Sequence, residues 1–221
     1  MKEDRVVPRK KDPAGPVIAA AMHLAALNGW RNVSLYDMAV EAGIGLDELT
    51  AVFPNREAVL AGIAAQADRA MLDAVDDDWA DETVRDRLFA LMIARFDALK
   101  DRREGLRSVL AALPADPAAA FCLAAGPGHR SMRLALEAAG VSSAGIRGAL
   151  AVKALSVAYL SVFRTFLNDD SADLSATMAA LDRALGRLDR LAMRVRRPGR
   201  FFGRKDGAEA ADEPATFGEP A

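Results

Sequence analysis

The sequence predicts an all-α protein in which a small N-terminal helical unit is followed by a larger helical unit. Of the 221 residues, 52% are hydrophobic but only 6% are aromatic, so Ala, Leu, Val and Met must build the core. Apolar residues recur every three or four positions along most of the chain, which is typical of helices with one buried face. The strictly alternating runs of half-buried strands are absent. A chain of this length forms one or two domains.

The first predicted helix spans residues 16–28, carries apolar residues on one face and ends at Gly29. A second helix is predicted to begin after Ser34. Serine is a preferred N-cap, and Asp37 stands three residues later, at the spacing of a capping box. The sequence therefore indicates a short, well-defined helix start at this position.

The segment Ala42-Gly43-Ile44 ends the second helix, because glycine tolerates the left-handed backbone of a tight turn. The third predicted helix spans residues 46–53 and turns Leu49 and Phe53 inward, and Asn55 caps a fourth helix. Helix, glycine turn and second helix follow the helix-turn-helix plan, which places one helix in the major groove of DNA.

The remainder of the chain, up to residue 196, reads as further amphipathic helices. Cys122 lies between two apolar residues and is predicted to be a buried apolar side chain, and residues 125–128 are predicted to form a turn. The predicted helices span residues 56–75, 81–99, 102–113, 117–124, 129–139, 143–167 and 171–196.

Four segments of the N-terminal unit resemble the DNA-binding domain of TetR-family transcriptional regulators. They are Ala20-Ala21 with Leu24 and Gly29, Val33-Ser34-Leu35, Ala39-x-x-Ala42-Gly43-Ile44, and Phe53-Pro54-Asn55-Arg56-Glu57-Ala58. The resemblance covers residues 14–62. It implies a flexible basic arm (1–13), a helix-turn-helix domain (14–60), a helical ligand-binding and dimerisation domain (61–197) and a disordered tail (198–221).

The predicted recognition helix departs from the pattern of that family. The family commonly reads S-K-G-T-L-Y-Y-H-F where this chain reads GLDELTAVF. Leu46 replaces the basic residue, Thr50 and the alanine after it replace the tyrosines, and Asp47 and Glu48 add two negative charges. DNA affinity depends largely on Lys and Arg side chains that neutralise phosphates, so this helix is poorly equipped to bind DNA.

Seven residues are candidate DNA contacts: Lys10, Lys11, Arg31, Tyr36, Leu46, Thr50 and Arg56. The lysines precede the first helix, where a basic arm can enter the minor groove, although such a segment can equally be a solvated terminus. Arg31 and Tyr36 stand at helix ends within reach of phosphates, but Tyr36 can also be a half-buried aromatic residue. Residues 1–60 hold seven Lys and Arg against eight Asp and Glu, whereas DNA-binding domains are usually basic.

Of the last two predicted helices, residues 143–167 are apolar nearly all round, and residues 171–196 carry Leu and Met about one turn apart. Helices of this kind are buried, and one subunit of this size cannot cover both of them. We therefore expect a homodimer through residues 143–196, as the resemblance also implies.

A ligand pocket is implied by the resemblance rather than by any motif. Few polar residues lie among its candidates, so an apolar small molecule or a lipid is the expected ligand, although apolar residues at helical spacing are more often core. The candidate lining residues are Phe89, Met92, Phe96, Phe121, Met132, Tyr159, Phe163 and Phe166.

Catalytic and metal-binding constellations are absent from the sequence. The two histidines lie far apart, the single cysteine excludes an internal disulfide, and no phosphate-binding loop is present. We expect neither an enzyme nor a cofactor. The N-terminus lacks the apolar stretch of a signal peptide, and no long uncharged apolar run predicts a membrane span. A cytoplasmic protein is expected.

The sequence supports two hypotheses on function. The first is a TetR-like, ligand-responsive transcriptional repressor that binds DNA as a homodimer. The alternative is a protein of the same fold that has lost DNA binding and acts at membranes as a lipid-binding accessory protein, similar to those of ubiquinone biosynthesis. Residues 187–205 carry eight basic residues and Phe201-Phe202, which suits an anionic membrane surface or nucleic acid. They can also be a charged helix end that continues into a solvated tail.

Overall fold

The computed structural model describes residues 13–75 and 79–196, and within these ranges it contains helices and no strand, as predicted. Short 3₁₀ turns or a π-helical turn join several of the helices. The helices are α1 (Ala14–Asn28), α2 (Leu35–Ala42), α3 (Leu46–Val52), α4 (Arg56–Asp73), α5 (Val84–Asp97), α6 (Arg103–Ala112), α7 (Pro117–Leu123), α8 (His129–Ala138), α9 (Gly145–Leu167) and α10 (Ser175–Arg196). The joining turns include η1 (Trp30–Asn32), η4 (Leu113–Ala115) and the π-helical η5 (Ala124–Gly128).

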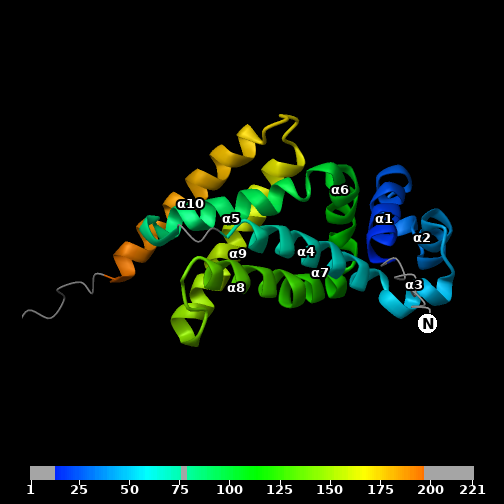
Figure 1. Ribbon diagram of the computed structural model, residues 1–221, viewed down its shortest axis with the longest axis horizontal. Coiled ribbons are helices and arrows are strands. Elements are labelled where there is room, and N and C mark those ends of the chain that lie inside the picture. The colour runs from blue at the N-terminus through cyan, green and yellow to red at the C-terminus, as the bar shows by residue number, and fades with distance from the viewer. Residues whose placement is uncertain (1–12, 76–78, 197–221) are drawn as a thin grey trace, which may run out of the picture.

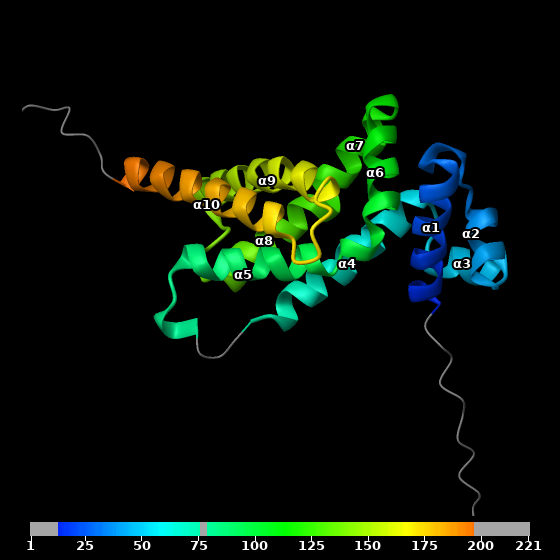
Figure 2. The ribbon, with the colours of Figure 1, turned by 90° about the horizontal axis from the view of Figure 1, so that it is seen from above.

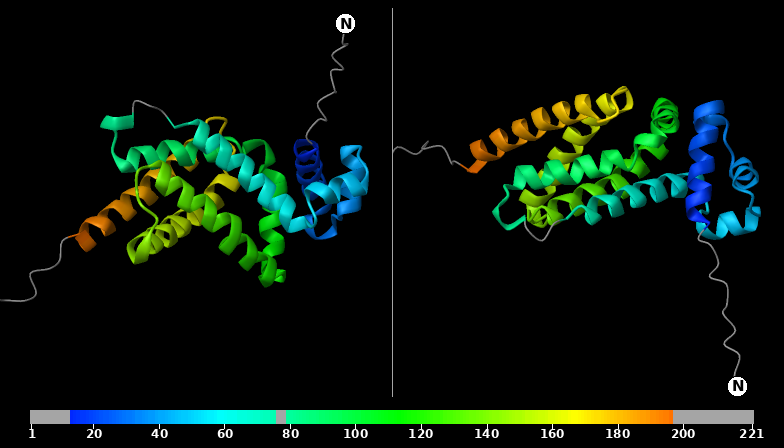
Figure 3. Two further views of the ribbon diagram at one scale, coloured as in Figure 1. Left: turned by 60° about the horizontal axis from the view of Figure 1, so that its bottom comes forward. Right: turned by 45° about the horizontal axis from the view of Figure 1, so that its top comes forward.

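The N-terminal helices lie at one end of the long axis of the molecule (Figure 1). Helices α1, α2 and α3 form a compact group there, and the described part of α10 ends at the opposite end (Figure 2). Helix α4 leads from this group into the larger unit, where α5, α8, α9 and α10 pack together (Figure 3). Helix α4 is continuous across residue 60, so a single helix connects the N-terminal group to the larger unit.

The turns of the N-terminal unit form as their residues predict. The Ser34 hydroxyl accepts from the Asp37 amide at 3.1 Å, and the Ser34 amide donates to the Asp37 carboxylate at 2.9 Å, which completes the capping box. The Ser34 hydroxyl also donates to this carboxylate at 2.6 Å. These hydrogen bonds hold the pKa of Asp37 below its usual value. Gly43 has a φ of 68° at the end of α2, and the Asn55 side chain accepts from the Ala58 amide at 2.8 Å.

Two close contacts fix the N-terminal unit against the rest of the molecule. Leu49 and Phe53 are buried, and a Cβ added to Gly62 of α4 would lie only 2.7 Å from the Phe53 ring. On α6, a Cβ added to Gly105 would lie 2.6 Å from the carbonyl oxygen of Met22 on α1. Helices α1 and α6 therefore approach each other at a distance that glycine permits.

Residues 125–128 do not form the predicted simple turn, because they continue the helix in a π-helical conformation from α7 to α8. Pro127 has no N–H to donate, and the wider turn accommodates it within the helix. The prediction that Cys122 is buried was also wrong: Cys122 is exposed. Helix α7 turns Ala119, Ala120 and Leu123 toward its neighbours, and Cys122 lies on the outer side.

Helix α9 has one buried and one exposed apolar face. Val152, Leu155 and Val162 are buried in the core, whereas Ile146 is 83% and Val157 70% exposed. In the described ranges α9 alone is long and apolar enough to cross a membrane, where none was predicted. Core helices of water-soluble proteins share that length and composition, and α9 packs against α8 and α10.

The connection from α9 to α10 is held by the carboxylate of Asp169. This side chain is buried and accepts hydrogen bonds from the backbone and hydroxyl of Thr177 at 2.7 and 2.6 Å. The backbone and hydroxyl of Ser171 also donate to it. Burial alone would raise the pKa of Asp169, but the hydrogen bonds from Ser171 and Thr177 hold the pKa at about 2.

Stability should therefore depend on the charge of Asp169 in acid. Because its folded pKa is depressed, the carboxylate stabilises the native state above its unfolded pKa of 3.8, and the contribution is lost as the pH falls toward about 2. The lost contribution amounts to about 2 kcal/mol. Urea unfolding should show that Asp169→Asn lowers the free energy of unfolding more at pH 6 than at pH 2.5. An equal loss of unfolding free energy at the two pH values would contradict this prediction. Asp170→Asn is the control, because Asp170 is the exposed neighbour of Asp169.

Candidate nucleic-acid interface

An open groove crosses the outer face of the N-terminal unit. Three parts of the chain form it: the segment from η1 into α2, the exposed side of α3, and the turn before α4. The lining residues are Arg31, Asn32, Val33, Ser34, Leu35, Tyr36, Leu46, Thr50, Pro54, Asn55, Arg56 and Glu57.

The structure brings five of the seven predicted DNA contacts together around this groove. They are Arg31, Tyr36, Leu46, Thr50 and Arg56. They are spread over 26 positions of the sequence, and only the helix-turn-helix geometry makes them neighbours. The other two, Lys10 and Lys11, lie outside the described residues.

Local features of the backbone position the exposed side chains that form the rim of the groove. The η1 turn presents Arg31 to solvent just before α2. Tyr36 lies in the first turn of α2 and is 63% exposed, so its ring is more accessible than that of a half-buried core aromatic. On α3, Leu46 is 43% exposed and Thr50 lies one turn later on the same side.

Arg56 has a structural role in addition to lining the groove. Its guanidinium donates to the carbonyl oxygen of Trp30 at 2.9 Å and lies 4.7 Å above the centre of the Trp30 ring. These contacts join the start of α4 to the η1 turn. Arg56 is half-buried and one of its N–H groups is already bonded, so fewer of its donors remain for a phosphate, although its positive charge remains in the groove.

The acidic residues of α3 do not line the groove. A Cβ added to Gly45 would lie 2.3 Å from a carboxylate oxygen of Asp47, so this carboxylate folds back over the start of α3. Two guanidinium groups, of Arg31 and Arg56, and the Glu57 carboxylate line the groove. The groove is therefore weakly positive, although α3 carries two acids.

A second concavity lies where the N-terminal unit meets α6, η4 and α7. It shares Arg31, Arg56 and Glu57 with the groove and adds residues from α4, η4 and α7, among them Leu60 and Asp116. Sequence reasoning missed this concavity, because no local pattern indicates which parts of the larger unit meet the η1 turn.

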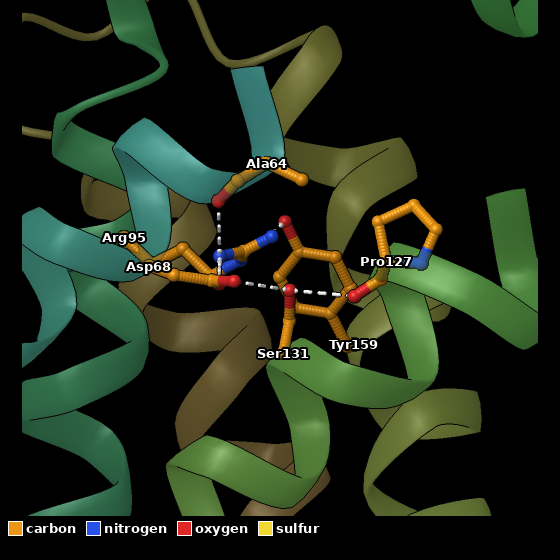
Figure 4. Close-up of polar contacts among 6 residues, drawn as sticks. All are labelled: Ala64, Asp68, Arg95, Pro127, Ser131 and Tyr159. Carbon is orange, nitrogen blue, oxygen red and sulfur yellow. Dashed lines mark hydrogen bonds and ion pairs between the residues drawn. The ribbon is translucent and has the colours of Figure 1, made fainter. Parts of the chain in front are cut away.

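The core of the larger unit contains a buried polar cluster that the sequence did not reveal (Figure 4). Asp68 of α4 and Arg95 of α5 form an ion pair in which both side chains are almost fully buried. Arg95 also donates to the Tyr159 hydroxyl of α9 at 3.3 Å, and the Ser131 hydroxyl lies 2.9 Å from both the Asp68 carboxylate and the Pro127 carbonyl. The cluster thus joins α4, α5, η5, α8 and α9.

The charge of Arg95 is maintained in this setting. Burial alone would lower the pKa of Arg95, but the Tyr159 hydroxyl and the Asp68 carboxylate raise it above its usual value. A backbone carbonyl of α4, that of Ala64, accepts a further hydrogen bond from Arg95 at 3.4 Å. The buried cation is therefore surrounded by acceptors from two helices.

The residues predicted to line a ligand pocket mostly pack against one another next to this cluster. Phe96 stacks on Tyr159 with ring centroids 5.1 Å apart, and Phe163 lies 5.7 Å from Tyr159. Met92 and Met132 are buried in the same core, and Phe89 packs against it. Phe121 does not join them: it is 72% exposed, because α7 turns its other side inward.

Comparison with known proteins identifies the fold. No protein-family model and no curated protein sequence matches the chain. A TetR transcriptional regulator from Nitrosomonas europaea is similar in structure, with a TM-score of 0.64 and 25% sequence identity over 80% of this chain and 98% of that chain. A TetR transcriptional regulator from a Rhodococcus species has a TM-score of 0.55 and 20% identity over 80% of this chain and 94% of that chain.

Proposed function

We infer that this chain, which has the fold of TetR-family transcriptional regulators, binds DNA and regulates transcription. The observation that supports this function is the groove of the N-terminal unit. Residues from η1, α2 and the start of α4 lie there beside the exposed side chains of α3. Arg31 and Tyr36 lie on its rim, where side chains of their type contact phosphates. The function places the protein in the cytoplasm, where it meets DNA.

Binding of the full chain to DNA fragments, including the region upstream of its own gene, tests the function. Fluorescence anisotropy over a series of salt concentrations should show saturable, sequence-dependent binding that weakens as salt rises. Arg31→Ala should weaken binding to all sequences and lower the salt slope by about two for a bound homodimer, because each subunit loses one phosphate contact.

Arg130→Ala is the matched control, because Arg130 is an exposed arginine on α8 and does not line the groove. Its binding and salt slope should equal those of the unaltered chain. If no fragment binds more tightly than random DNA, the proposed function is wrong.

We propose that the exposed face of α9 forms a homodimer with a second copy of the chain, within residues 143–196. Large apolar side chains recur there at helical spacing: Ile146, Leu150, Val157 and Leu160 are each more than half exposed. The exposed Lys153 lies within this stripe, and the stripe is otherwise apolar. An exposed, mostly apolar face of this kind marks an interaction surface. A two-fold axis would allow the same stripe to cover itself.

Val157→Glu should convert the dimer into a monomer, because it places charges in the centre of the apolar stripe. Size-exclusion chromatography with light scattering measures the mass directly. Leu27→Glu is the matched control, since Leu27 is 68% exposed on α1 and lies outside this face. A dimer mass for Val157→Glu, or a monomer mass for the unaltered chain, would refute the proposed interface.

We further propose that the protein responds to an apolar small-molecule ligand and acts as a repressor. The aromatic core around Phe96, Tyr159 and Phe163 supports an apolar ligand, and the adjoining Arg95 offers one polar group. Helix α4 carries Asp68 of the polar cluster and begins at the DNA-binding groove, so it is the path for a ligand signal.

The membrane-bound alternative gains no support from the solved structures, since both proteins named above are transcriptional regulators by description. This alternative depends on residues 187–205, and residues 197–205 of that segment lie outside the described residues. The regulator is therefore the function that we propose.

A further inference from the structure

We propose that α3 recognises thymine methyl groups in the major groove of DNA, through apolar contacts from Leu46 and Thr50. This inference rests on the proposed DNA-binding function and names the feature of the bases that the groove reads. It replaces the hydrogen-bonded readout that a recognition helix commonly provides.

The first argument is the chemistry of the side chains that α3 presents to the groove. Leu46 and Thr50 are the α3 residues that line it, they are exposed, and they lie one turn apart on one face. One is wholly apolar and the other carries a methyl group. In the major groove the thymine C5-methyl is the base feature that apolar side chains and threonine methyls contact.

The second argument is the lack of donors for the other bases. Guanine is recognised mainly by Arg or Lys and adenine by Asn or Gln, and α3 contains none of these four residue types. The Thr50 hydroxyl already donates its hydrogen to the Asp47 carbonyl oxygen at 3.2 Å, so it has no donor left for the acceptors of guanine. Hydrogen-bonded readout of purines by α3 is therefore poorly supported.

The acids of α3 do not supply an alternative readout in this groove. A carboxylate can only accept, and cytosine N4 is its base partner in the major groove. The Asp47 carboxylate folds back toward Gly45, and Glu48 is half-buried and does not line the groove. Thymine methyls thus match what α3 exposes better than the polar edge of any base.

The rim of the groove supplies the phosphate contacts that the apolar side chains of α3 cannot make. Arg31 and Tyr36 lie beside α3 and can contact phosphates, which fixes the position of the helix without reading sequence. Binding energy and base selection are then divided between different residues: charge on the rim and methyl contact in the centre.

The experiment uses the full chain and DNA selected by it from a random duplex library. In the selected duplex each dT is replaced by dU, one position at a time, which removes the methyl group and keeps every hydrogen-bonding group of the base. At the contacted positions we expect the affinity to fall about fourfold for each methyl removed from an apolar contact. The same replacement in flanking DNA outside the selected site is the control.

Variants of the chain then assign the contacts to side chains. Leu46→Ala should abolish the difference between dT and dU at one position in each half-site of the homodimer, whereas Arg31→Ala should weaken the dT and dU duplexes by the same factor. Thr50→Ser removes a methyl and keeps the hydroxyl, while Thr50→Val keeps the branched shape and removes the hydroxyl. Binding should weaken more for Thr50→Ser than for Thr50→Val.

The outcomes separate this inference from the proposed function. Sequence-selective binding that is equally strong on dT and dU duplexes would overturn methyl recognition and leave the regulator function standing. Failure to select any sequence would overturn both. A loss confined to particular dT positions, and removed by Leu46→Ala, would establish methyl recognition by α3.

Discussion

Replacing Asp68 by alanine is expected to lower the free energy of unfolding by about 3–5 kcal/mol, because the Arg95 charge would be left buried without its partner. Both side chains of the pair are almost fully buried, so the guanidinium left behind would not reach bulk water. The Ser131 hydroxyl would also lose one of its two acceptors. Chemical denaturation followed by circular dichroism measures the change.

Two comparisons isolate the buried charge as the cause. Lys100→Ala removes an exposed ion pair with Asp97, at 2.8 Å, and should cost less than about 1 kcal/mol. Asp68→Leu combined with Arg95→Met removes both charges and should recover much of the loss. If Asp68→Ala alone costs no more than Lys100→Ala, the polar cluster does not stabilise the fold as proposed.

Replacing Gly105 by valine is expected to separate α1 from α6. Even a Cβ at this position would lie 2.6 Å from the Met22 carbonyl oxygen and 3.0 Å from the Met22 Cα, both of which are backbone atoms that cannot rotate away. Overpacking of this kind costs about 1–3 kcal/mol. The Trp30 amide would also lose its hydrogen bond to the Ser108 hydroxyl, now 2.7 Å, if the helices move apart.

Hydrogen exchange resolves this effect by region. The amides of α1 should lose protection in Gly105→Val, while those of α9 should keep it. Gly15→Ala is the matched control, because it also adds a Cβ to a helical glycine but meets no atom within 4 Å. Unchanged protection of α1 in Gly105→Val would show that the two helices can adjust without separating.

The fold of the N-terminal unit could be predicted because its signals are local. The capping box of Ser34 and Asp37, the left-handed Gly43 and the cap at Asn55 each lie within four residues of the backbone that they control. The all-helical class and the inward positions of Leu49 and Phe53 are confirmed for the same reason: helical periodicity is a property of neighbouring residues.

What could not be predicted depends on contacts between distant residues. Asp68 and Arg95 each resemble a surface charge in the sequence, and only tertiary packing brings them together. Arg56 was assigned to DNA alone because its contact with Trp30, 26 positions earlier, has no local signal. Phe121 was placed in a pocket by its residue type, although the orientation of α7 leaves it exposed.

The weakly positive groove also determines how the protein would search for its site. Affinity for random DNA comes almost entirely from phosphate contacts, which also allow a protein to slide along the duplex. Among the described residues that line the groove, Arg31 and Arg56 carry positive charge, Arg56 while bonded to Trp30, and Glu57 carries a negative charge. By itself, a groove of this charge would therefore hold random DNA weakly and favour approach to the operator from solution. The occupancy of the operator in the cell would follow the free concentration of the protein closely, because the bulk of the chromosome would sequester little of it.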